Sequence, residues 1–421
     1  MDQTSHTSGN LNRSIIIIGA LFFIFGFITW LNSLLIPYLE IACELSTFQS
    51  FFVTFAFYIA YVVMAPISTR TLNIFGFKNG MSVALILMAF GALLFIPAAM
   101  SRTYILFLVG LFIMGSGLAV LQTASNPYVT IVGPPESAAK RISIMGICNK
   151  MAGALAPILI GFFLQLDKAD ALKSDLTNLS EAQRTIELNE MALRVIPPYI
   201  GIIVALLLLA LWVYKSSLPE IDTDKEDEEL SVSNAKKSSV FDFPHVILGV
   251  IALFLYVGVE VIAADSIISY GASQGIPLDT AKYFATGTMF TMVIGYIIGI
   301  FTIPKFISQE NALRVSAILG VILSVLAIIT NGYVSLACIA LLGLANALMW
   351  PAIWPLALAD VGRFTKAASS LLVMGIAGGA IIPLAYGALA DIWSAQAGYW
   401  VMVPCYLFIL YFSTVGYKLR K

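Results

Sequence analysis

Charged residues are scarce in this sequence. Only 11% of its 421 residues are Asp, Glu, Lys or Arg, and 59% are hydrophobic. Soluble domains carry about 25% charged residues. A soluble globule of this length would lack the polar groups needed to cover its surface. The composition therefore predicts an integral membrane protein, whose outer surface faces lipid.

Histidine, cysteine and nucleotide-binding motifs are scarce or missing as well. The two His are far apart and the four Cys lie in separate apolar segments, so no spacing indicates a structural metal site or a disulfide framework. A net charge of -1 gives no sign of a nucleic-acid-binding surface. The sequence has no Walker A phosphate loop, which argues against ATP-driven transport by this chain alone. We expect no cofactor and no enzymatic activity, although a lone Asp/Glu pair leaves a membrane enzyme open.

What the sequence does contain is a series of long apolar runs. A helix of about 20 mostly apolar residues crosses the hydrocarbon core of a bilayer. Lipid offers the backbone no hydrogen-bond partners, so these runs are predicted to be helices. The twelve predicted spans are residues 14–39, 48–70, 79–100, 103–132, 139–166, 192–215, 243–272, 279–303, 311–330, 333–360, 366–390 and 397–418.

The distribution of positive charge predicts the orientation. If both termini lie in the cytoplasm, sixteen of the 23 Lys and Arg residues are on the inside and six are outside, with Lys150 within a span. Cytoplasmic loops carry an excess of Lys and Arg. We therefore predict a multi-pass membrane protein with both termini in the cytoplasm.

The spans divide into two sets of six around a polar central segment. We predict an N-terminal six-helix bundle at 1–215, a cytoplasmic linker at 216–242 and a C-terminal six-helix bundle at 243–421. The stretch AGALAPILIG at 152–161 matches GGAIIPLAYG at 378–387, each in the fifth span of its half. Parallel repeats of this kind place a substrate site near the bilayer midplane. The predicted fold is all-α, with two pseudo-symmetric bundles.

Local signals add two expectations. Ser180 and Gln183 have the spacing of a capping box, which predicts a short surface helix before the sixth span. Pro127, Pro157 and Pro383 lie inside spans, where we expect them to break the helices and serve as gates.

Three charged residues stand out because they lie away from the ends of predicted spans: Lys150 in the fifth, and Glu260 and Asp265 in the seventh. A charge at the centre of a membrane helix costs about 2.5–3.5 kcal/mol on insertion scales. Such residues indicate a substrate or ion site, and a structural ion pair is the alternative. Lys150 and Glu260 lie at compatible depths, so we predict that they pair.

Neutral polar and aromatic side chains also share helix faces. Amides donate and accept hydrogen bonds, which suits the hydroxyls of a sugar, and aromatic faces can cover the apolar face of a sugar ring. The alternatives are that the amides join helices and that the Trp side chains anchor the protein at the membrane interface. The predicted sugar-binding residues are Asn32, Gln122, Asn126, Asn149, Tyr256, Glu260, Asn346, Trp350 and Trp354.

Several motifs carry a family resemblance. They are LQTASNPYVTIVGP at 121–134, ICNKMAGALAP at 147–157, LNSLLIPYL at 31–39, FLYVGVEVIAADSIISYG at 254–271, TGTM at 286–289 and WPAIWPLAL at 350–358. With these motifs the chain resembles the fucose/glucose–galactose sugar symporter family of the major facilitator superfamily, and it is most similar to the glucose/galactose branch. The resemblance implies a cation-coupled hexose importer of the bacterial inner membrane that works by alternating access, and we expect a monomer.

We predict a different coupling ion from the proton of the fucose–proton symporters. Those relatives have acids at the positions matching Ser33 and Gln122, and both residues here are neutral. A carboxylate with amide and hydroxyl oxygens nearby suits a hard cation, and glucose/galactose members of the family include sodium-driven examples. We therefore predict Na⁺ at Glu260 and Asp265, with Lys150 and Ser33 contributing to coupling. Proton coupling, a drug or metabolite exporter and a non-transporting sugar sensor stay open as alternatives.

Overall fold

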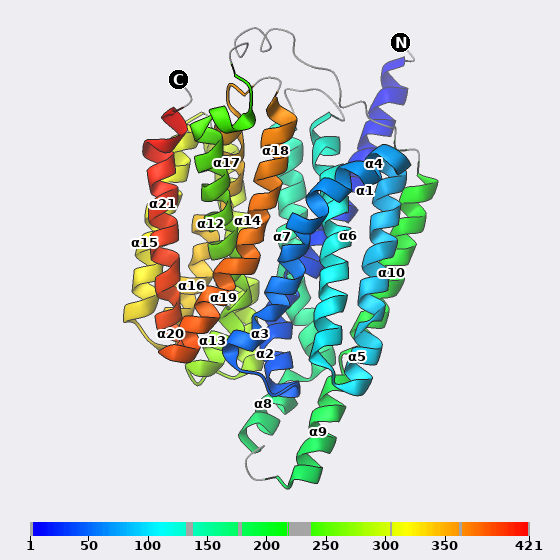
Figure 1. The fold of residues 1–421 in the computed structure, drawn as a ribbon, viewed down its shortest axis with the longest axis vertical. Helices are drawn as coiled ribbons and strands as arrows, with labels where there is room; N and C mark the ends of the chain where they lie inside the picture. Colours follow the sequence, from blue (N-terminus) through cyan, green and yellow to red (C-terminus); the bar gives the residue numbers. More distant parts are fainter. Residues whose placement is uncertain are drawn as a thin grey trace. The chain divides into compact units, whose positions relative to one another are not determined.

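The computed structural model describes residues 3–131, 138–175, 179–216, 218, 237–303, 305–361 and 364–419. Every regular element in these ranges is a helix (Figure 1). Twelve helical segments of the described residues are long and apolar enough to cross a membrane, which confirms the predicted spans. The chain packs as two compact units, Met1–Leu45 with Val63–Thr223, and Ser46–Val62 with Asp224–Lys421.

The first unit contains the helices of the N-terminal half. These are α1 (Gln3–Thr29), α2 (Asn32–Ala42), most of α4 (Phe52–Leu93), α5 (Phe95–Ser101), α6 (Tyr104–Ile131), α7 (Ala138–Leu164), α8 (Leu166–Asp175), α9 (Glu181–Leu193) and α10 (Ile196–Lys215). Within α4 the backbone leaves the helical region at Gly76, where φ is 75°. Glycine adopts this conformation without steric cost, so the residue separates the second span from the third.

The second unit contains the C-terminal helices and a short piece from the N-terminal half. The longer helices are α12 (Pro244–Asp265), α14 (Leu278–Thr302), α15 (Gln309–Ile329), α16 (Gly332–Ala347), α17 (Met349–Leu358), α18 (Thr365–Met374), α19 (Gly378–Ile392) and α21 (Met402–Thr414). The shorter ones are α3 (Thr47–Ser50), α13 (Ile267–Ser273), α20 (Ala395–Gly398) and the 3₁₀ turns η2 (Val240–Asp242), η4 (Gly375–Ala377), η5 (Tyr399–Val401) and η6 (Gly416–Lys418).

The start of the second span packs with the C-terminal helices. The Phe51 ring meets Tyr386 edge-on at 5.2 Å, and the Phe48 amide donates to the Asp391 carboxylate at 2.9 Å. The predicted bundle limits at 215 and 243 stay predictions, and residues 219–236 of the predicted linker lie outside the described residues. The end of that predicted linker is folded as η2.

Within each half, a close glycine contact joins the first span to the fifth span. A Cβ at Gly26 of α1 would lie 1.8 Å from the Asn149 carbonyl oxygen of α7. A Cβ at Gly378 of α19 would lie 1.7 Å from the Phe254 carbonyl oxygen of α12. Small residues let membrane helices approach this closely. The first and fifth spans therefore pack closely in each half, with the glycine on the first span in the N-terminal half and on the fifth span in the C-terminal half.

The outward-facing side chains are apolar in both units. Phe162 is 79% exposed, Ile105 69% and Phe301 72%. A surface of this kind would be costly in water, and it is the normal surface of a protein in lipid.

Interruptions near polar side chains separate α1 from α2, α12 from α13, and α16 from α17. The helix breaks expected at Pro157 and Pro383 themselves are wrong, because α7 and α19 continue through these residues, and α6 likewise runs past residue 127 to Ile131. The eleventh span is instead interrupted before α19, by the 3₁₀ turn η4. Neighbouring helices and side chains compensate for the backbone hydrogen bond that proline removes.

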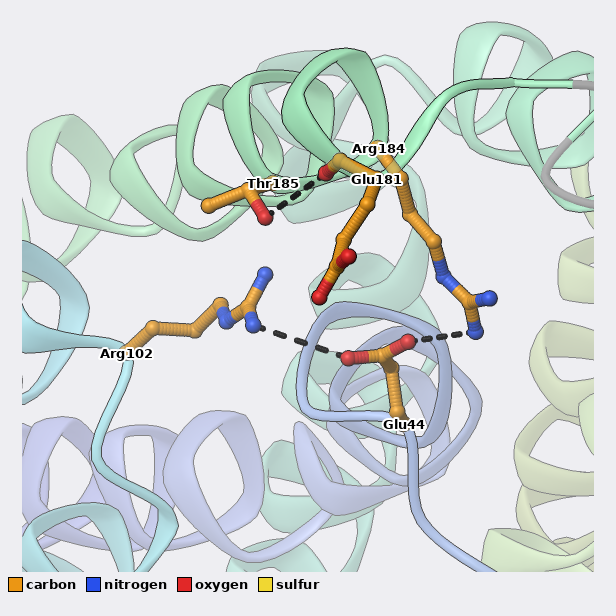
Figure 2. Close-up of polar contacts among 5 residues, drawn as sticks. All are labelled: Glu44, Arg102, Glu181, Arg184 and Thr185. Carbon is orange, nitrogen blue, oxygen red and sulfur yellow. Dashed lines mark hydrogen bonds and ion pairs between the residues drawn. The ribbon is translucent and has the colours of Figure 1, made fainter.

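Polar contacts at one end of the first unit fix the helix before the sixth span (Figure 2). The predicted capping box is confirmed, since Ser180 and Gln183 cap α9 reciprocally. The Glu44 carboxylate accepts from Arg184 at 2.5 Å and pairs with Arg102 at 3.5 Å. One carboxylate after α2 therefore joins α9 to the end of α5.

Candidate functional site

In the first unit, the polar residues predicted on the fifth span meet Trp30 at the end of α1. The Trp30 Nε1 donates to the Asn149 side-chain oxygen at 3.3 Å, and the Lys150 Nζ lies 4.1 Å from the centroid of the Trp30 ring. Asn149 also donates to the Phe22 carbonyl oxygen at 3.4 Å. A buried ammonium over an indole face is favourable by about 2 kcal/mol or more when it is desolvated. Sequence analysis missed Trp30, although it directly precedes the LNSLLIPYL motif.

Asn32 and Ser33 begin α2, directly after the interruption. The Ser33 hydroxyl donates to the Trp30 carbonyl oxygen at 2.9 Å. Asn32 is 1% exposed, and neither the oxygen nor the nitrogen of its side-chain amide has a hydrogen-bond partner in the part of the chain that the structure describes. A buried amide without partners costs about 1–3 kcal/mol by mutational measures. Such a cost marks Asn32 as a residue able to bind a polar ligand.

Gln122 lies half-buried on α6 and takes part in a polar interaction. The side chain of Asn126, predicted one turn further on, lies outside the described residues. The face that these two amides were predicted to share is therefore untested.

In the second unit, the predicted aromatic and amide residues gather around α12. The Trp350 and Trp354 rings stack with centroids 5.3 Å apart, and Trp350 lies 6.4 Å from the ring of Tyr256. The Asn346 side-chain oxygen accepts from the Tyr406 hydroxyl at 2.9 Å, while its Nδ2 is buried without a partner. Three predicted residues from α12 and α17 thus form one aromatic group.

Glu260 lies one turn from Tyr256 and is 8% exposed. It interacts with Tyr256 on its own helix and electrostatically with Tyr296 and Tyr406. Tyr296 and Tyr406 were not predicted, because tyrosine is common in membrane spans and only packing brings these two to α12.

Asp265 ends α12 and is fully buried at 0% exposed. Among the described residues, neither of its carboxylate oxygens has a hydrogen-bond partner. Glu260 lies five residues earlier on the same helix. Tyr58 of the second span packs near this part of α12, because a Cβ at Gly379 would lie 3.0 Å from the Tyr58 ring and 3.1 Å from the Val261 side chain. The cation site at Glu260 and Asp265 stays a prediction.

The pairing of Lys150 with Glu260 and the cation site at Glu260 and Asp265 both stay predictions. Lys150 belongs to the first unit and Glu260 to the second, so their pairing would join the two units. In the part of the chain that the structure describes, no group of three or more His, Cys, Asp or Glu is arranged to hold a metal ion. A cation at Glu260 and Asp265 would therefore take its other ligands from hydroxyls, carbonyls or water.

The described residues form twelve helical segments able to cross a membrane, and both units bury polar groups, an arrangement expected of a membrane transporter. Residues 18–375 match the family described as Major Facilitator Superfamily. FucP, a transporter of this superfamily in the outward conformation, matches with a TM-score of 0.70 and 28% identity, covering 96% of this chain and 98% of that chain.

Sequence relatives narrow the family further. The glucose/galactose transporter of Brucella abortus is 34% identical, covering 94% of this chain and 92% of the relative. The L-fucose-proton symporter of Escherichia coli is 31% identical, covering 88% of this chain and 85% of the relative. The chain belongs to the Major Facilitator Superfamily and, within it, to the family of these glucose/galactose transporters and L-fucose-proton symporters.

Proposed function

We propose that this protein imports a hexose of the glucose or galactose type together with a sodium ion, by alternating access. It would act as a monomer in the bacterial inner membrane with both termini in the cytoplasm. The names of its relatives support the substrate class. The buried, unpartnered carboxylate of Asp265 is the observation that carries the ion-coupled part of the proposal.

The side chains suited to sugar lie in both units. Trp30 and Asn149 in the first unit, and Tyr256, Asn346 and Trp350 in the second, combine aromatic faces with amide groups. Hexoses present an apolar ring face together with hydroxyls that donate and accept, so these groups match both properties. Lys150 and Glu260 would supply charged hydrogen-bond partners for the hydroxyls, which are stronger than neutral ones.

The surroundings of Asp265 favour a cation. α12 ends at this residue, and the C-terminal end of a helix carries partial negative charge. Interrupted helices that expose carbonyl groups are typical ion sites in transporters. A sodium ion would compensate the buried charge, for which the described residues supply no hydrogen-bond donor.

Glu260 would couple the ion to the sugar. It interacts with Asp265 on one side and with Tyr256 on the other. A cation at Asp265 offsets the repulsion between the two carboxylates and leaves Glu260 available to the sugar hydroxyls. Coupling is reciprocal, so sugar must tighten sodium binding by the same factor as sodium tightens sugar binding.

A proton is the second candidate for the coupling ion. A fully buried carboxylate such as Asp265 can carry a proton itself, and one relative is named an L-fucose-proton symporter. The two candidates differ in what they predict. Sodium coupling makes sugar affinity depend on sodium at constant pH, whereas proton coupling makes it depend on pH without sodium.

Binding measurements test the proposal. The affinities of the purified protein for glucose, galactose, mannose and fucose are measured with and without sodium across pH. We expect sodium to tighten glucose or galactose binding about tenfold, within the usual range of coupling energies, and Asp265→Asn to remove this effect. A change with pH alone would assign the proton, and no affinity for any hexose would contradict the proposal.

A further inference from the structure

The segment Ser46–Val62 packs against α19 within the second unit. A Cβ at Gly387 would lie 3.0 Å from the Phe51 ring, and one at Gly379 would lie 3.0 Å from the Tyr58 ring. The hydrogen bond from the Phe48 amide to Asp391 holds the beginning of the segment. Glycines of α19 thus leave room for the aromatic side chains of the second span.

The ring of Tyr58 packs between α19 and α12. A Cβ at Gly379 would lie 3.0 Å from the Tyr58 ring and 3.1 Å from the Val261 side chain. Val261 lies one turn before Asp265 on α12, so Tyr58 lies beside the face of α12 that carries Asp265. The side chain of Tyr58 is 4% exposed, and its ring stacks on Tyr61 with centroids 6.2 Å apart. A phenylalanine would pack equally well in this seat, so packing alone does not account for the hydroxyl.

Thr54 lies one turn before Tyr58 on the same helix. It is 0% exposed, and its hydroxyl has no hydrogen-bond partner among the described residues. A buried hydroxyl without a partner is destabilising unless a ligand satisfies it. Both carboxylate oxygens of Asp265 likewise have no partner among these residues. The second span and α12 therefore each contribute a buried, oxygen-bearing side chain without a hydrogen-bond partner to the second unit.

We infer that the second span completes the cation site, with the Tyr58 hydroxyl as an oxygen ligand beside Asp265 and the Thr54 hydroxyl as a further one. The inference rests on the cation site of the proposed function. Sodium prefers oxygen ligands, and a neutral hydroxyl adds one without adding charge. Because these residues lie on the segment seated on α19, a bound cation would also hold that segment in place.

The test compares conservative variants that keep the packing. In Tyr58→Phe the ring stays and the hydroxyl is lost, and Thr54→Val is its counterpart at the second ligand. The matched control is Tyr199→Phe, since Tyr199 is a buried tyrosine of the first unit whose hydroxyl has no partner. Sodium is titrated at fixed pH, and pH is titrated without sodium, while glucose uptake into proteoliposomes is measured.

We expect Tyr58→Phe to raise the half-saturating concentration of the driving cation about tenfold and Thr54→Val to raise it severalfold. The maximal rate at saturating cation should change little, and Tyr199→Phe should match wild type. Hydrogen exchange in residues 46–62 should slow on cation binding in wild type and less so in Tyr58→Phe. A purely structural role for Tyr58 would instead lower protein yield or maximal rate and leave cation affinity unchanged.

The variant Asp265→Asn distinguishes a failure of the inference about the second span from a failure of the proposed cation site. If Asp265→Asn removes cation dependence while Tyr58→Phe and Thr54→Val keep wild-type cation affinity, the inference about the second span is wrong and the proposed function stands. If Asp265→Asn also keeps wild-type cation dependence, the proposed cation site itself is wrong.

Discussion

Asp265 and Asn32 both keep polar atoms buried in membrane spans without a partner. Each lies beside an interruption of its helix, Asp265 at the end of α12 and Asn32 at the start of α2. Unsatisfied polar groups in a low-dielectric interior are costly. The proposed function uses both groups, the acid of the second unit for the cation and the amide of the first unit for the sugar.

Trp30 is predicted to organise the sugar-binding residues of the first unit. Trp30→Phe keeps a ring face under Lys150 but removes the donor to Asn149, so glucose affinity should fall severalfold. Trp30→Leu removes both interactions. It should weaken binding further and lower the melting temperature, because a desolvated cation–π contact is worth about 2 kcal/mol. Binding and thermal denaturation measure the two effects, and wild-type values for Trp30→Leu would contradict this role.

Cys43 follows the first span and lies near the ion pairs of Figure 2. Burial raises the pKa of the Cys43 thiol to about 11, and the Arg102 guanidinium partly opposes this rise. Since the thiolate is the reactive form, Cys43 should react with a maleimide at pH 8 about a hundredfold more slowly than an unperturbed cysteine. Arg102→Ala should slow the reaction further. Mass spectrometry of a variant that keeps only Cys43 measures the rate of the maleimide reaction. A rate equal to that of the unfolded chain would contradict the raised pKa of the Cys43 thiol.

At the scale of the helices, glycine sets how closely α12 and α19 approach. In Gly378→Ala the new methyl group would overlap the Phe254 carbonyl oxygen, because a Cβ at this position would lie only 1.7 Å from that atom. Overpacking of this kind costs about 1–3 kcal/mol or more, so we expect a lower melting temperature in detergent. Gly201→Ala on α10 is the matched control, because a Cβ there meets nothing within 4 Å. Equal melting temperatures for the two variants would show that this contact is not tight.

The 3₁₀ turn η2 before α12 should respond to acid. The backbone amides of Ser238 and Ser239 donate to the Asp242 carboxylate at 2.8 and 3.0 Å. These hydrogen bonds, that of Ser238 first, hold the pKa of Asp242 below its ordinary value of 3.8. The folded turn therefore prefers the charged carboxylate. The stabilisation of the turn by the Asp242 carboxylate is fully present above the ordinary pKa of Asp242. It is lost as pH falls through the lowered pKa that Asp242 has in the folded turn.

Hydrogen exchange over residues 237–243 measures this effect after correction for intrinsic rates. Protection should be constant from pH 7 to pH 5 and decline below the ordinary pKa of Asp242. Asp242→Ala should lack the protection at every pH. Protection that is the same in the variant and in wild type would contradict the proposed cap.

For the whole molecule, composition and periodicity were enough to predict the fold. The twelve spans, the capping box at Ser180 and the repeat in α7 and α19 all follow from local sequence. Polarity within spans also identified Asn149, Tyr256 and Trp350, which the structure brings into contact with other polar or aromatic groups. These features were predictable because a charge or amide in lipid is rare enough to be informative by itself.

The rest depends on which helices pack together, and no local pattern carries that information. Trp30 becomes a partner of Lys150 only because α1 packs on α7, and Tyr58 lies near Val261 of α12 only because the start of the second span joins the second unit. Proline was a poor guide to helix breaks, since tertiary packing tolerates Pro157 and Pro383 within continuous helices. Aromatic residues with no unusual charge beside them in the sequence were overlooked, because only packing brings them close to charged residues of another helix.

Cation-driven accumulation of sugar tests the central claim most directly. Labelled glucose uptake into proteoliposomes is measured with an inward sodium gradient at equal pH, and with an inward proton gradient without sodium. We predict accumulation above equilibrium with the sodium gradient, its loss in Asp265→Asn, and simple equilibration with the proton gradient. Accumulation driven by protons alone would transfer the coupling role to the proton, and equilibration under both gradients would contradict symport.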